Sequence, residues 1–179
     1  VSNYPINMGK GDFRLDGILT VDGVSPVNLQ NMTTVFINKI ARLTGANGNY
    51  AAVSLKSPPA TTVINEIDAV NAAAASSAPV LRWSPSAIGQ LHIPIVKGGA
   101  QYVISYETTA IAGTVLIDNL YSADAASPDI LNGKAVINGT SNKNIVTVVK
   151  NLYLGEYGNI PVDGPFRFFD NNSTLTFKD

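Results

Sequence analysis

The sequence predicts a mainly β protein, folded as an antiparallel β-sandwich or jelly roll with one short α-helix at about residues 62–75. Two observations carry the β prediction. Asp-Gly and Asn-Gly pairs recur along the chain, and such pairs tolerate the positive φ values of tight hairpin turns. Most of them lie beside short runs of Val, Ile, Leu, Phe and Thr, which favour strands. Short strands at close intervals are typical of sandwiches and jelly rolls.

The N-terminal part is expected to combine an arm with short strands. Residues 1–12 hold Pro5 and two glycines, and they predict an extended arm on a single domain that spans residues 1–179. Residues 13–24 predict a tight hairpin ribbon that turns at Asp16-Gly17. Residues 33–43 fit a strand face and a helix face about equally, and their β-branched and aromatic residues favour the strand.

One segment predicts a helix. Pro58-Pro59 interrupts the chain, and the threonine that follows at position 61 or 62 is a suitable N-cap. Apolar residues then recur at spacings of three and four, which place them on one helical face. These residues are Val63, Ile64, Ile67, Val70 and Ala74. Four alanines at 72–75 favour the helix, and Ser76-Ser77 ends it or acts as a hinge before a separate sandwich.

The rest of the chain predicts strands. Pro94 indicates that the strand containing it lies at a sheet edge or forms a bulge. We find no internal repeat. The expected strands cover residues 50–56, 80–83, 91–96, 101–108, 114–120, 134–138, 144–150, 152–157, 166–169 and 174–178.

The composition indicates a surface with few charges. Charged residues make up 14% of the chain, whereas a typical soluble domain has about 25%. Neutral polar residues replace them, with 18 Asn, 13 Ser and 13 Thr. Interspersed charges usually keep a free protein soluble. This chain is therefore expected to be covered by partners or to work outside the cell.

Several classes of partner and cofactor are not expected. The net charge of −1 does not indicate a nucleic-acid partner. No apolar run is long enough to cross a membrane. The absence of cysteine excludes disulfides and thiolate metal sites. We expect no cofactor.

No catalytic residue is predicted. The single histidine, His92, lies between Leu91 and Ile93, so strand alternation assigns it to a solvated face. Three carboxylates in and beside one loop, Asp118, Asp124 and Asp129, are weak calcium candidates, because calcium requires only oxygen ligands. Loop turns explain them equally well.

The aromatic residues allow a second interpretation. Trp83 and Tyr157 could form a platform for a sugar ring, although packing in a core or an interface is the ordinary role of such residues.

These observations predict a non-enzymatic structural subunit. It would assemble by subunit packing and by exchange of an arm or an edge strand, which adds a strand to a neighbour's sheet. The profile resembles the β-sandwich head-decoration and other accessory proteins of tailed phages in composition and architecture only. It implies a virion or extracellular particle, with copies of this chain or a major capsid or other particle protein as partners. The interface candidates are Tyr4, Ile6, Phe166, Phe168, Phe169 and Phe177.

Two alternatives remain for the function. One is an extracellular carbohydrate-binding module or adhesin, and the other is a pilin-like subunit. An enzyme would depend on aspartates alone.

Overall fold

A computed structural model gives the architecture of the chain. It describes residues 6–7, 9–21, 27–29, 32–42, 53–56, 61–69, 80–84, 89–98, 103–106, 112–121, 137–138, 145–154 and 162–177. Tyr4, Asp124, Asp129 and Tyr157 lie outside these residues.

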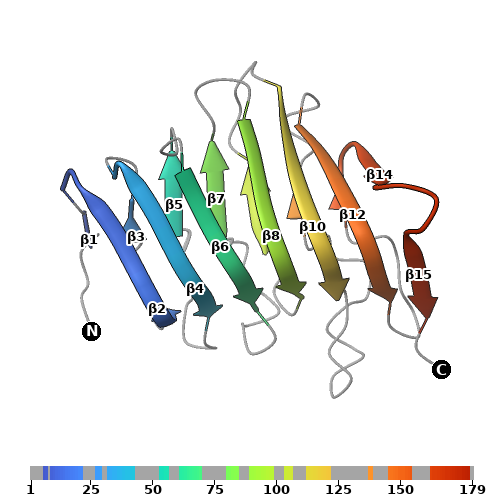
Figure 1. Cartoon of the computed structure of the whole chain (residues 1–179), viewed down its shortest axis with the longest axis horizontal. Helices are drawn as coiled ribbons and strands as arrows, with labels where there is room; N and C mark the ends of the chain where they lie inside the picture. The colour runs from blue at the N-terminus through green and yellow to red at the C-terminus, as the bar shows by residue number, and fades with distance from the viewer. Residues whose placement is uncertain are drawn as a thin grey trace.

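The described residues form two β-sheets, which lie one behind the other in Figure 1. The seven-stranded sheet contains β1 (Ile6–Asn7), β3 (Val27–Asn28), β5 (Val53–Lys56), β7 (Leu81–Ser84), β9 (Ile104–Tyr106), β11 (Ile137–Asn138) and β13 (Val162–Asp163). The eight-stranded sheet contains β2 (Asp12–Val21), β4 (Thr34–Arg42), β6 (Thr61–Asp68), β8 (Gly89–Lys97), β10 (Gly113–Tyr121), β12 (Ile145–Leu154), β14 (Phe166–Phe168) and β15 (Thr174–Phe177).

From β1 to β14, successive strands alternate between the two sheets. Every pair of neighbouring strands that the structure describes within a sheet is parallel. The chain therefore rises along one sheet, returns along the other and advances by one strand position in each coil (Figure 1). This architecture is a parallel β-solenoid, in which each coil contacts its neighbours along one axis.

The predicted antiparallel β-sandwich and jelly roll are wrong, because all strand pairs of the described residues are parallel. The predicted likeness to β-sandwich phage decoration proteins loses its architectural basis with them. The predicted hairpin at Asp16-Gly17 is also wrong. Strand β2 passes through both residues and shifts register between Leu15 and Ile18, which is the signature of a β-bulge.

The predicted helix at about residues 62–75 is wrong where the structure describes it. Residues 61–68 form β6, which pairs with β4 and β8, and residues 70–75 lie outside the described part. No helix occurs in the described ranges, so none of these residues forms a helix that could cross a membrane.

A bend shared by the strands of the eight-stranded sheet explains the helical appearance of β6. Ile64 and Ile67 are both buried, and the two residues between them are not. The same spacing separates Ile37 from Ile40 and Ile117 from Leu120. Buried residues three positions apart imitate the period of a helix, although the backbone is extended.

Pro94 lies at this bend in β8, a central strand and not the predicted edge. The register pairs Ile93 with Ile117 and then Ile95 with Asn119, so it passes over Pro94. A proline lacks an amide hydrogen for the ladder, and an interrupted ladder tolerates it.

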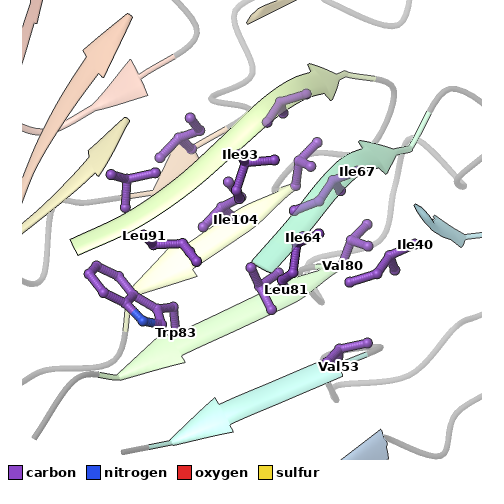
Figure 2. Close-up of a cluster of buried hydrophobic side chains, with 14 of the residues drawn as sticks. Ile40, Val53, Ile64, Ile67, Val80, Leu81, Trp83, Leu91, Ile93 and Ile104 are labelled. Atoms are coloured by element: carbon purple, nitrogen blue, oxygen red, sulfur yellow. The ribbon is translucent and has the colours of Figure 1, made fainter. Parts of the chain in front are cut away.

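The core lies between the two sheets. Figure 2 shows Ile64, Ile67 and Ile93 of one sheet facing Leu81 and Ile104 of the other, and all five are fully buried. The indole of Trp83 fills the space beside Gly113. A Cβ built on Gly113 would lie 3.2 Å from the indole and 3.1 Å from the carbonyl oxygen of Gly89. A side chain at position 113 would therefore require its close-packed neighbours to shift by a few tenths of an ångström.

Candidate functional site: the apolar C-terminal end

The core of the solenoid is built from rows of side chains that run from coil to coil. One row in the eight-stranded sheet follows the strand register through seven residues, namely Leu19, Ile40, Ile67, Val96, Leu120, Leu152 and Leu175. Its inner members, Ile40 to Leu152, are at most 1% exposed. Leu175, at the end of the row, is 46% exposed. The last side chain of the row therefore lies in a core position without being fully covered by other residues.

Two further rows end in the same way. Phe168 continues the row of Ile117 and Val149, both fully buried, yet it is 37% exposed. Phe177 pairs in register with the buried Leu154 and is 61% exposed. We call Phe168, Leu175 and Phe177 the open end. They have core positions and surface exposure, which is unusual for large apolar side chains grouped together.

Two short strands, β14 and β15, together occupy the last position of the eight-stranded sheet, beside β12. Strand β14 pairs with the first half of β12, and β15 pairs with the second half. A turn separates them, in which the Asn172 amide donates to the Asp170 carboxylate at 2.9 Å and the Ser173 amide donates to the Asp170 carbonyl at 3.2 Å. In the described residues, neither β14 nor β15 has a partner strand on the side away from β12. Such an edge is a template for another strand.

Phe166 and Phe169 flank the open end. Phe166 is half-buried against the core and meets Phe168 edge-to-face, with ring centroids 5.4 Å apart. Phe169 is exposed, and the Lys150 ammonium lies 5.2 Å from its ring centroid. The packing of Phe166 on the core and the contact of Phe169 with Lys150 of β12 therefore connect this end to the preceding coil.

The outer face of the eight-stranded sheet carries paired charges. The Glu66 carboxylate contacts the ammonium groups of Lys97 at 2.9 Å and Lys39 at 3.2 Å, and Lys39 also contacts Asp68 at 2.7 Å. Burial raises the pKa of Glu66, but hydrogen bonds from Lys97 and Lys39 outweigh it and leave that pKa below its usual value. Hydrogen bonding to Asp68 raises the pKa of Lys39.

A second cluster lies on the same face. The Asp118 carboxylate contacts the Lys150 ammonium at 2.6 Å and His92 Nε2 at 2.9 Å. Burial raises the pKa of Asp118, and the hydrogen bonds from Lys150 and His92 together lower it below its ordinary value. These ion pairs join neighbouring strands and hold the carboxylates charged, as expected for structural contacts on a sheet.

Neutral side chains form ladders beside the charges. Asn151 donates to the Asn119 side-chain carbonyl at 3.1 Å and accepts from the Thr174 hydroxyl at 2.9 Å. Next to them, the rings of Tyr121 and Tyr153 stack at 4.5 Å. The first ladder ends at β15, so it fastens the outer face of the open end to the body.

The structure places the remaining predicted site residues apart from any common site. Asp118 belongs to β10 and is occupied by Lys150 and His92, and the described residues contain no group of three or more His, Cys, Asp or Glu that could hold a metal. Trp83 is 1% exposed, so its ring cannot meet a sugar. Ile6 lies in β1, at the opposite end of the seven-stranded sheet.

Leu175 completes the open end, and the sequence analysis missed it. Its signal was the alternation of Leu175 and Phe177 with two threonines, which predicts one apolar face in a strand close to the phenylalanines. Comparison with protein-family models, curated proteins and solved structures found no match for this chain.

Proposed function

We propose that this protein is a non-enzymatic structural subunit that assembles with another β-structured chain through its open end. One observation carries the proposal: core rows whose inner members are buried end in the exposed Phe168, Leu175 and Phe177. Burying a fully exposed side chain of this size contributes roughly 1.5–3 kcal/mol, and covering the exposed part of each of these three contributes a fraction of that. The unpaired edge of β15 adds backbone hydrogen-bonding groups at the same place.

The outer face supports the same function. Glu66 and Asp118, whose carboxylates could serve as acid or base, are held in their charged forms by Lys39 and Lys97 in one case and by Lys150 and His92 in the other. General acid–base catalysis favours a pKa near the working pH, and these pKa values are shifted away from it. An extracellular particle as the location, and the identity of that particle, stay predictions.

Sedimentation velocity across the micromolar range tests the proposal. The unaltered chain is expected to form oligomers whose fraction rises with concentration. The double variant L175S/F177S should sediment as a monomer with an unchanged far-UV circular dichroism spectrum, because it removes apolar surface that the monomer leaves uncovered.

Ile18→Ser is the matched control. Ile18 is 58% exposed, close to the 61% of Phe177, but it lies in β2 at the other end of the sheet. Its replacement should leave association unchanged. A chain that stays monomeric at high micromolar concentration, or oligomers that survive L175S/F177S, would contradict the proposal.

A further inference from the structure

We infer that the occupant of the open end is a second copy of this chain, joined across a two-fold axis by antiparallel pairing of β15 with the partner's β15. The inference rests on the proposed function and adds the partner, the symmetry and the register. Three features of the described residues carry it: the obstructed edge at β2, the small net charge of the last coil, and the alternation in β15.

The obstructed edge excludes head-to-tail stacking. Strand β2 is the other terminal strand of the eight-stranded sheet. It contains the bulge between Leu15 and Ile18, and the exposed side chains of Arg14 and Asp16 form an ion pair of 2.6 Å beside that bulge. Bulges and charges are the devices that prevent a sheet edge from accepting another strand.

The last coil does not repel a copy of itself. Residues 162–177 contain Arg167 against Asp163 and Asp170, so their charge is close to balanced. With little like-charge repulsion to overcome, apolar burial decides the association. A self-complementary patch of this kind suits the isologous contact of a two-fold dimer.

The alternation in β15 fixes the register. Residues opposite each other in an antiparallel pair lie on the same face of the sheet. A two-fold axis at Thr176 pairs Leu175 with the partner's Phe177, and Phe177 with the partner's Leu175, on the core side. It pairs Thr176 with the partner's Thr176 on the outer side. A Leu–Phe pair across two strands buries apolar surface, and a Thr–Thr pair is favourable by hydrogen bonding. The core rows that end at Leu175 and Phe177 thereby continue into the second copy.

Single-cysteine cross-linking tests this arrangement without interference, because the chain has no cysteine of its own. Opposite Cβ atoms in such a pair are about 4.5–5.5 Å apart, close to disulfide range. Thr176→Cys should therefore form a disulfide-linked dimer in most molecules under mild oxidation, and a short bis-maleimide should give the same product.

Thr20→Cys is the control. Thr20 occupies the same outward row as Thr176 through the register of the intervening strands, but it lies in β2. A mixture of the two variants should yield only Thr176-linked dimers, and sedimentation of the unaltered chain should stop at the dimer.

Each other outcome has a definite meaning. Mixed dimers linked through positions 20 and 176, with oligomers that grow without limit, would overturn the two-fold arrangement in favour of head-to-tail stacking. Concentration-dependent association without cross-linking at position 176 would overturn the inference and leave the proposed function standing. A chain that stays monomeric at every concentration would overturn both.

Discussion

The core row that contains Leu19 and Leu175 differs in exposure between the two ends of the solenoid. At the β2 end, Leu19 is partly buried against the core, and the strand carries a bulge and charged side chains. At the β15 end, Leu175 is 46% exposed, and alternating threonines take the place of charges. Because a solenoid that lacks a polar cap exposes its core, the difference supports a capping role for β2 and the proposed contact role for β15.

Four leucines in one row provide the sharpest comparison, and the largest expected effect. Leu120 and Leu152 are interior, Leu19 is partly buried and Leu175 is exposed. Replacing Leu120 or Leu152 by Ala should lower the free energy of unfolding by about 2–5 kcal/mol, because a cavity remains. Leu19→Ala should cost less, and Leu175→Ala should cost the least in dilute, monomeric protein.

Chemical denaturation of the four variants measures this order. At high concentration the cost of Leu175→Ala should rise, because the interface is then lost with the side chain. Equal costs for Leu19→Ala and Leu175→Ala at every concentration would remove the distinction between the two ends.

Substitutions at two glycines, one in the interior and one at the β2 edge, compare the packing of these two regions. Gly113→Ala should destabilise the fold by about 1–3 kcal/mol through overpacking against Trp83. Gly17→Ala is its control, because a Cβ at Gly17 would have nothing within 4 Å. Thermal unfolding should show a clear decrease in melting temperature for the first variant only. A comparable decrease for the second would show that the bulge is a rigid, packed element.

Acid should weaken the body through its outer face. The pKa values of Glu66 and Asp118 are lowered on folding, so their contribution to stability is present above the unfolded values, which are 4.5 and 3.8. It is lost as the pH falls through the lower folded values. Each carboxylate should contribute about 1 kcal/mol or less.

Denaturation of the unaltered chain and of the E66Q/D118N variant, compared from neutral pH to pH 3, measures this contribution. The decrease in the free energy of unfolding between neutral pH and pH 3 should be smaller in the variant. An unchanged pH dependence would show that other carboxylates control acid unfolding. The pKa of Lys39 is raised on folding, so its contribution persists up to its unfolded value of 10.5 and is lost above it.

The smallest expected change in stability accompanies a large change in assembly. Deleting Gly17 leaves two residues between Leu15 and Leu19, the spacing that the inner strands have at their bend. The straightened β2 edge should then accept a strand, and oligomers larger than a dimer should appear in sedimentation. If the deletion variant stays dimeric, the bulge is not what closes the β2 edge.

The sequence predicted many strands and the wrong arrangement of them. The strand predictions at residues 91–96 and 114–120 are confirmed by β8 and β10. Parallel sheets usually appear as continuous apolar runs, because helices cover both faces. A solenoid sheet is covered on one face only, so its strands alternate as antiparallel strands do. Alternation alone cannot separate the two.

The repeat was hidden by uneven coil lengths. Asp12 and Thr34 are register partners 22 positions apart, whereas Gly113 and Ile145 are 32 positions apart. No fixed period exists for a sequence comparison to find. The pattern that the sequence does show is local. Two outward residues lie between two buried apolar residues, as they do between Ile64 and Ile67. This signal was mistaken for a helix in β6.

Three of the predicted interface residues lie at the surface, and their role in an interface stays a prediction. Large apolar residues near the end of the chain, beside an expected strand, suggested contact with a partner, and the structure places Phe168, Phe169 and Phe177 at the surface. Their common feature, an uncovered core row, depends on register between coils. Register is set by contacts distant in sequence, so the separation of the open end from the β2 end could not be inferred beforehand.

Amide hydrogen exchange at two protein concentrations tests the difference between the ends most directly. At high concentration, amides of Thr174–Phe177 should exchange more slowly than at low concentration, because pairing protects them, and amides of Asp12–Val21 should exchange at the same rate at both. Protection that appears at both ends, or at β2 alone, would contradict the account.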